Sequence, residues 1–399
     1  MNLKLLLFYS IAFLVLYLEP IAIGGLTFGI LWKLILLFFI VILLIPKLKN
    51  LGNSELFIFF YILLAFKMLF NYSIQAYPIE TITLSIKAFM FPLLYLFFFN
   101  TFTKDGLLFF LKHYAIMIIL SFIPYIVGIL TPMGVGYDLS IYGHDGEQGL
   151  VGPFLKPHSA SISLAFAMIV VTAHIKSENS FTKNIFYIGL IILGFYALIE
   201  TYVRTGIVIY LVALLYFYLQ NINMKKILFI IITAFSLAGA GFYLMQTSDI
   251  VKMRLEDRNV YVKQDEVGSG RFTYWSSAVE NWLNDEPLVI LVGLGEEYGM
   301  DKMLVSAGMR IFAHNEFFQM LQQEGLIGFS FFLLGLFFIS RYISRYKYSI
   351  YHRDAKAVYL AMLTMMFFQG GFYFNIVFFL SIYLVLLKLD SNNTTRISV

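Results

Sequence analysis

The chain has 399 residues, of which 60% are hydrophobic and 13% are charged, with a formal net charge of +4. This composition leaves too little polar surface to cover a soluble globule of that length, so we expect lipid to be the solvent. The positive charges stand at the ends of apolar runs instead of clustering on one domain, which argues against nucleic acid as a partner. The sequence contains no cysteine, which excludes disulfides and thiolate metal sites.

Apolar runs long enough to cross a hydrocarbon core of ~30 Å recur about twelve times along the chain. The predicted fold class is therefore all-α, a polytopic membrane protein. No small-residue cleavage site follows the first run, so we interpret it as a retained span. The last two runs are separated only by Gly370-Gly371, which leaves open one broken helix. The runs are residues 5–23, 29–45, 56–70, 82–99, 107–130, 157–173, 185–199, 205–219, 227–245, 326–340, 357–370 and 372–387.

The distribution of lysine and arginine predicts the orientation of these spans. Basic residues should concentrate in the short cytoplasmic loops, and they do so in alternate loops when the N-terminus is placed inside. This topology divides the chain into spans one to nine (residues 1–245), one large outer loop (246–324), and the last three spans with a cytoplasmic tail (325–399). We expect the outer loop to form short helices on the bundle, because it is marginal for an independent fold.

Two arginines on the outer side are candidate anion ligands. Arg204 begins a span, and Glu200 stands four residues earlier, so on one helix the two side chains would share a face and could pair. The alternative is that the guanidinium fork of Arg204 binds phosphate. Arg271 falls in the first turn of a predicted helix, where a cation opposes the helix dipole unless it shares an anionic ligand with the helix N-terminus. A solvated surface arginine is the alternative reading of Arg271.

Two histidines lie at or near the outer face. His314 and Asn315 precede an apolar helical stripe, and Asn315 is a good N-cap. The helix dipole disfavours protonation of a histidine at that position, which suits a neutral general base. An interfacial histidine without a chemical role is the alternative. His158 lies near the outer end of the span at residues 157–173.

Three lysines lie within or at the ends of apolar spans, in their outer halves. Snorkelling of the ammonium group towards water accounts for Lys33 and Lys67, whereas Lys87 is deep enough to require a partner or a polyanionic headgroup. The segment Gly293-Leu294-Gly295 is similar to a dinucleotide fingerprint only superficially, because no βαβ unit can surround it in an outer loop. We expect these glycines to let the backbone pass close to the membrane surface or to a ligand.

In chain order these segments resemble the O-antigen ligase and polymerase superfamily of bacterial surface-polysaccharide assembly. The resemblance runs from residue 152 to residue 328 and rests on five short motifs. They are Pro157-His158, Arg204-Thr205-Gly206, Gly270-Arg271-Phe272 with Trp275, Pro287-Leu288 with Gly293 and Gly295, and His314-Asn315 with Gln319, Gly325 and Gly328. The resemblance implies a GT-C-like, metal-independent and cofactor-free glycosyltransferase at the periplasmic face of the inner membrane, with both termini in the cytoplasm.

The resemblance also implies roles for individual residues. Arg204 and Arg271 would hold the diphosphate of an undecaprenyl-linked oligosaccharide, and His314 would activate the acceptor hydroxyl. We add further expected substrate-binding residues, namely Glu200, Tyr274, Asn315, His158 and Lys87.

Three functions are compatible with this reading of the sequence. The first is a polymerase that joins lipid-linked donor and acceptor glycans, with a chain-length regulator protein as a candidate partner. The second is a ligase that transfers the glycan to lipid A–core. The third is a flippase for lipid-linked oligosaccharide, which is disfavoured because the polar residues gather in one asymmetric outer region and not in two repeated halves.

Overall fold

The computed structural model describes residues 22–23, 26–27, 35, 55–74, 78–127, 135–138, 148–154, 156–177, 180–219, 271–369 and 374–397. The expected spans at residues 5–23, 29–45 and 227–245 lie wholly or largely outside these ranges, as do Lys33 and Gly270. The side chain of Lys87 also lies outside the described part, although its backbone belongs to a helix.

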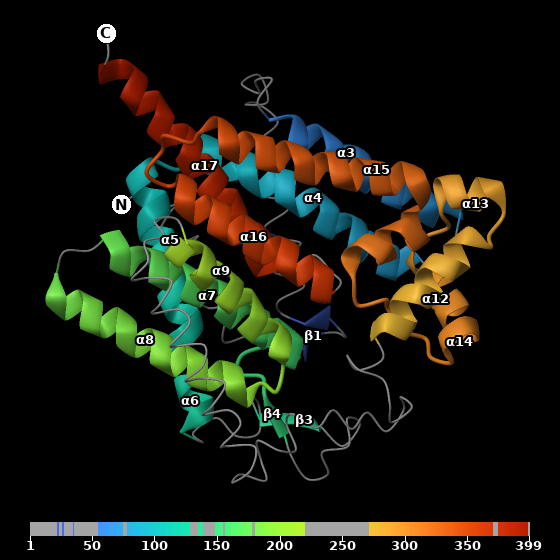
Figure 1. Cartoon of the computed structure of the whole chain (residues 1–399), viewed down its shortest axis with the longest axis horizontal. Coiled ribbons are helices and arrows are strands. Elements are labelled where there is room, and N and C mark those ends of the chain that lie inside the picture. Colours follow the sequence, from blue (N-terminus) through green and yellow to red (C-terminus); the bar gives the residue numbers. More distant parts are fainter. Residues whose placement is uncertain are drawn as a thin grey trace.

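Helices dominate the described residues, which confirms the predicted helical class (Figure 1). The only strands described are two short antiparallel pairs, β1 (Ala22–Ile23) with β2 (Leu26–Thr27) and β3 (Val135–Asp138) with β4 (Gln148–Leu150). The helices are α3 (Leu56–Ile74), α4 (Pro78–Thr101), α5 (Lys104–Leu120), α6 (Ile123–Ile126), α7 (Pro157–Ser177), α8 (Phe181–Glu200), α9 (Arg204–Leu219), α12 (Arg271–Leu283), α13 (Pro287–Val292), α14 (Glu296–Ala307), α15 (Glu316–Arg345), α16 (His352–Phe368) and α17 (Phe374–Ile397).

Each expected span within the described residues lies mainly on a helix. Four helical segments are long and apolar enough to cross a membrane: Lys104–Ile126, Pro157–Ile175, Phe181–Glu200 and Glu316–Arg345. Three shorter apolar helices are Leu56–Asn71, Phe89–Thr101 and Arg204–Leu219. The last two apolar runs form separate helices, α16 and α17, because the chain turns extended at Gln369. The full number of twelve spans stays a prediction.

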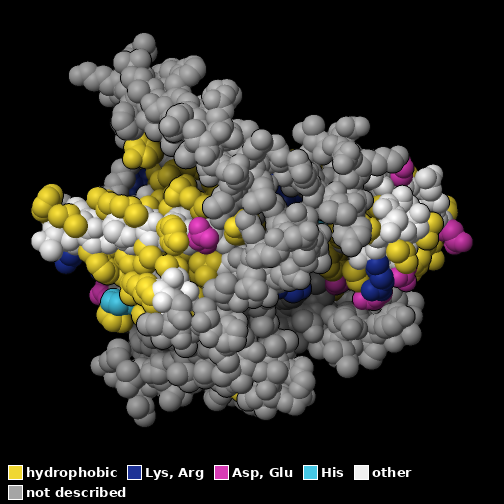
Figure 2. Space-filling view, turned by 90° about the horizontal axis from the view of Figure 1, so that it is seen from below, with side chains coloured by type: hydrophobic (Ala, Val, Ile, Leu, Met, Phe, Trp, Pro, Cys, Tyr) yellow, Lys and Arg dark blue, Asp and Glu magenta, His cyan; other side chains and the backbone are white. Residues whose placement is uncertain are grey.

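Small side chains place α7 in the interior of the bundle. It packs against α5, α8 and α9, and Ala160, Ala165 and Ala167 on it are fully buried. Side chains of this size let neighbouring helices approach closely without leaving voids. The neighbouring helix α8 has the opposite character, because Phe181 and Ile192 are 78% and 66% exposed. Figure 2 shows hydrophobic side chains gathered at the α8 end, whereas charged side chains gather at the end formed by α12–α14.

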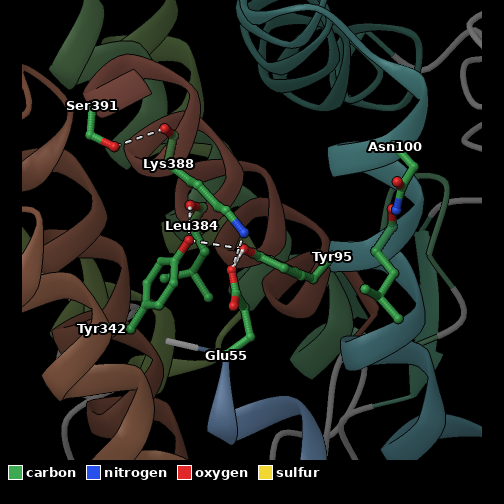
Figure 3. A network of polar contacts seen from close by, with 8 residues as sticks. Glu55, Tyr95, Asn100, Tyr342, Leu384, Lys388 and Ser391 are labelled. Carbon is green, nitrogen blue, oxygen red and sulfur yellow. Dashed lines mark hydrogen bonds and ion pairs between the residues drawn. The ribbon is translucent and has the colours of Figure 1, made fainter. Parts of the chain in front are cut away.

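Residues that the topology assigns to the cytoplasmic end contact one another (Figure 3). Glu55, just before α3, accepts a hydrogen bond of 3.3 Å from the hydroxyl of Tyr95 on α4 and forms an ion pair with Lys388 on α17. The hydroxyls of Tyr95 and Tyr342, on α15, are 2.9 Å apart. Four helix ends that the charge distribution assigns to the same side therefore meet in one polar network. Which side faces the cytoplasm stays a prediction.

Residues assigned to the opposite end also meet, and here one expectation is wrong. Lys67 does not snorkel: its side chain is only 8% exposed, and its Nζ lies 3.1 Å from Oε2 of Glu324 on α15. Asn71, one turn further along α3, donates to the same oxygen over 2.9 Å. Burial of a charged side chain requires such partners. Sequence spacing gave no sign of this contact, because the two residues are 257 positions apart.

A glycine-mediated crossing divides α15 into residues 316–324, which we name the outer part after the side predicted for it, and residues 326–345. Gly325 interrupts the helix with φ 62°, and Gly293, which follows α13, has φ 69°. The two backbones touch: a Cβ on Gly325 would lie 2.5 Å from the nitrogen of Gly293. The amide of Gly295 also donates to the carbonyl of Gln323 over 2.7 Å. The glycines therefore let one backbone pass against another, and this contact sets the direction of the outer part of α15.

Replacing Gly325 by alanine should destabilise the protein strongly, whereas Gly308→Ala should cost much less. Both glycines have positive φ, so both changes introduce backbone strain of about 1–2 kcal/mol. Only at Gly325 would the new Cβ also strike backbone atoms, which adds about 1–3 kcal/mol of overpacking. Thermal unfolding in detergent measures the difference, and equal unfolding temperatures for the two variants would refute the crossing.

Candidate functional site

Three titratable side chains from distant parts of the chain converge on one region. They are His158 at the start of α7, Arg271 at the start of α12, and His314 just before α15. The pKa of His314 is lowered to about 4, chiefly by burial and then by the positive charge of Arg271 and the proximity of His158. The predicted neutral state of His314 agrees with this direction. The main cause of the low pKa is burial, however, and not the helix dipole from which the neutral state was predicted.

The backbone at His314 adopts a strained conformation. His314 has φ 51°, a left-handed value that residues other than glycine seldom adopt, and it is followed by the extended Asn315. The side chain of Asn315 accepts hydrogen bonds from the amides of Phe317 and Phe318, which confirms the predicted N-cap. Strain of this kind persists only where surrounding contacts enforce it, and it often marks functional positions. Here the cap and the glycine crossing fix the outer part of α15 that follows His314.

Packing between α12, α14 and α15 positions Arg271. Tyr274 and Ala278, on the buried face of α12, form a small apolar cluster with Met303 on α14 and Ala313. The ring of Tyr274 lies 6.2 Å from the ring of His314, and its hydroxyl donates to the sulfur of Met309. Arg271, one turn before Tyr274, is thereby placed beside His314. The rings of Tyr274 and His314 are therefore neighbours, and binding of Tyr274 to substrate stays a prediction.

The motif around Arg204 meets α7 close to His158. The hydroxyl of Ser161, one turn after His158, donates to the carbonyl of Val203 over 3.1 Å. A Cβ on Gly206 would lie 2.1 Å from that hydroxyl oxygen, so glycine is required for α9 to approach α7. Arg204 itself is exposed and begins α9. The two chain segments that carry Arg204 and His158 are therefore neighbours at one end of the bundle.

The expectation that Glu200 and Arg204 share one helix face is wrong. Helix α8 ends at Glu200, and α9 begins at Arg204. Tyr202 between them has φ 60°, which breaks the helical path. The spacing of four residues therefore does not place the two side chains on neighbouring turns of a helix.

Two further residues with polar groups lie close to His314 and were not predicted as site residues from the sequence. Trp275 follows Tyr274 on α12 and packs its ring 5.9 Å from that of Phe318 on α15. Gln319 lies one turn after Asn315 and is buried. Both residues belong to the motifs of the resemblance, but the sequence indicated no role for either of them.

The arrangement is suited to binding an anion beside a neutral base. Arg271 supplies positive charge next to His314, whose ring is unprotonated near neutral pH because its pKa is about 4, so the ring is in the form that a general base requires. Among the residues that the structure describes, no three histidine, aspartate or glutamate side chains are grouped to hold a metal ion. An arginine-based site stabilises negative charge directly through charge-assisted hydrogen bonds.

Part of the chain matches a family of known proteins. A family model described as O-antigen ligase matches residues 189–333, a range that holds the C-terminal part of α8, all of α9 and α12–α14, and α15 as far as residue 333. Arg204, Arg271 and His314 all lie within the matched range. None of the curated proteins compared with the chain matches it.

Proposed function

We propose that this chain, of which residues 189–333 match the O-antigen ligase family model, is a surface-polysaccharide polymerase of the bacterial inner membrane and of the O-antigen ligase and polymerase superfamily. It transfers an undecaprenyl-diphosphate-linked glycan onto the next lipid-linked repeat unit at the periplasmic face. The observation that carries this proposal is the buried, neutral His314 beside Arg271, within residues matched by the family model.

The proposed reaction is a direct displacement without metal or cofactor. His314 takes the proton of an acceptor hydroxyl as its oxygen forms a bond to the anomeric carbon of the donor sugar. The bond from that carbon to the phosphate oxygen breaks, and undecaprenyl diphosphate leaves with the electron pair. Arg271 and Arg204 stabilise the charge that develops on the diphosphate. Because the leaving group is already activated, the donor itself supplies the driving force.

The surroundings of the catalytic pair supply the remaining proposed contacts. His158 and Asn315 adjoin His314 and bind substrate, and Lys87 and Glu200 are proposed to do so from α4 and from the end of α8. In this proposal helices α12–α14 act as a lid over the bound substrate.

A ligase is the second candidate, and the description of the matching family model favours it. A ligase uses the same donor, so the same arginines and histidine would serve it, but its acceptor is lipid A–core. A flippase is the least favoured candidate, because it needs no neutral base beside a phosphate-binding arginine.

Deletion of the gene in the cells of origin, followed by a lipopolysaccharide gel, separates these functions. A polymerase defect should leave one repeat unit on the core. Loss of every repeat with accumulation of lipid-linked polymer would instead establish a ligase. Purified protein in detergent, without a second compartment, should convert lipid-linked glycan to longer products. An enzyme of either kind would be refuted if the purified protein failed to convert this substrate although lipid-linked repeat units still reached the outer face of the membrane in cells.

A further inference from the structure

Buried polar atoms without a hydrogen-bond partner gather around the site. Eight such side-chain atoms occur among the described residues, and five belong to elements that form the site or adjoin it. They are Nδ1 of His158, Nε1 of Trp275, Nδ2 of Asn315, Oε1 of Gln319 and Oε1 of Gln369. A buried donor or acceptor without a partner destabilises the folded protein, so their concentration in one region points to a ligand that satisfies them.

Ring contacts join three of the helices that carry these atoms or end beside them. Trp275 on α12 packs against Phe318 on α15, at 5.9 Å between ring centroids, and against Phe367 on α16, at 5.3 Å. Gln319 directly follows Phe318, and Gln369 stands two residues after Phe367. These contacts bring together the chain segments that carry Trp275, Gln319 and Gln369, where α12, the outer part of α15 and the end of α16 meet.

The chemistry of these atoms distinguishes between ligands. The cap fixes the amide of Asn315, because its Oδ1 accepts from Phe317 and Phe318 and leaves Nδ2 as the available donor. Gln319 donates through Nε2 to Gln323, which leaves its Oε1 as an acceptor. The indole nitrogen of Trp275 is a donor only. Phosphate oxygens accept hydrogen bonds and would satisfy only the donors, whereas a hydroxyl group both donates and accepts.

We propose that Trp275, Asn315 and Gln319 form a subsite for the hydroxyl groups of a sugar ring of the lipid-linked glycan. This inference rests on the proposed function and deepens it, because it separates sugar recognition from diphosphate binding at Arg271. Nδ1 of His158 and Oε1 of Gln369, which are also buried without a hydrogen-bond partner, are further candidate contacts of this sugar. The subsite provides donors and acceptors at fixed positions, so it selects sugars by the placement of their hydroxyl groups.

A pair of tryptophan variants tests the subsite. Trp275→Phe removes the unsatisfied N–H and keeps an aromatic ring, whereas Trp282→Phe removes an N–H that donates to the carbonyl of Ile290 over 3.1 Å. Without ligand, we expect Trp275→Phe to unfold at the wild-type temperature or above, and Trp282→Phe to unfold at a lower temperature. In transfer assays, Trp275→Phe should raise KM for the lipid-linked glycan about threefold to tenfold, the value of one neutral hydrogen bond, with kcat nearly unchanged.

Binding experiments separate the subsite from the diphosphate site. The probes are lipid-linked glycan extracted from the cells of origin and undecaprenyl diphosphate without a sugar, each titrated into the purified protein. Trp275→Phe should weaken binding of the glycan and leave binding of the sugar-free lipid unchanged. Gln319→Met should behave in the same way, whereas Gln322→Met, which loses a bond to the carbonyl of Gly299, should not weaken glycan binding selectively.

Several results would overturn the subsite. One is equal weakening of both probes by Trp275→Phe, which would assign the indole to diphosphate binding. Another is unchanged binding of both probes, and a third is a fall in unfolding temperature as large as that of Trp282→Phe. If wild-type protein binds glycan in the predicted pattern but never transfers it, the proposed function fails and the subsite stands.

Discussion

Replacing Arg271 by alanine should reduce glycan transfer by about two to three orders of magnitude, the usual effect of removing one preorganised donor from developing negative charge. Arg271 is the positive charge that acts most strongly on His314, so it stands where an anionic leaving group would be stabilised. Arg271→Lys should retain part of the activity, because lysine keeps the charge and loses the bidentate fork. Product ladders from purified protein measure the effect.

Arg310 provides a matched control for Arg271. It belongs to the same outer region, but its side chain is 43% exposed and its guanidinium is paired with Glu297 and Asp301. Ion pairs on an exposed surface contribute only about 0–1 kcal/mol to stability, so Arg310→Ala should express and transfer glycan normally. Comparable losses in both variants would mean that a general decrease in positive charge, and not Arg271, explains the result.

Replacing His314 by glutamine should lower the rate by about 10²–10⁴-fold, the range that general-base assistance contributes. Glutamine retains hydrogen bonding and is unable to accept the proton. His113→Gln is the control, because that histidine lies on α5, where its Nδ1 contacts the carbonyl of Phe109. Normal ladders from His314→Gln would remove this residue from the mechanism.

The pH dependence gives an independent test of the same residue. Because the pKa of His314 is about 4, kcat/KM should stay level from neutral pH to about 5 and fall as the pH decreases through about 4. In Arg271→Ala the fall should move to higher pH, since a positive charge that lowers the pKa has been removed.

The free energy of unfolding should likewise decrease as the pH decreases. The pKa of His314 in the folded protein is below its ordinary value of 6.5, so the unfolded chain binds the proton first as the pH decreases. The stabilising contribution of neutral His314 is present above pH 6.5 and is lost between about 6.5 and 4. His314→Gln should therefore weaken the pH dependence of the unfolding temperature in this window.

The sequence predicted the helices and the N-cap, because both depend on residues that are close together in the chain. Apolar runs coincide with helices because a segment that spans lipid must satisfy its backbone hydrogen bonds internally. The N-cap at Asn315 follows from the ability of its side chain to accept from nearby amides. The motif residues Arg204, Arg271 and His314 were identified in the same way, from residue type and position within an element.

Only the tertiary structure decided how these residues meet. Three contacts join segments that are far apart in the chain. They are the pairing of Lys67 with Glu324, the crossing of Gly293 and Gly325, and the approach of His158 to His314. The physical reason is that periodicity records which face of a helix is apolar, but not which helix covers it. Burial and charge at His314 arise from that packing. The sequence alone therefore identified the candidate base and predicted its neutral state, whereas the fold determined the main cause of that state, which is burial.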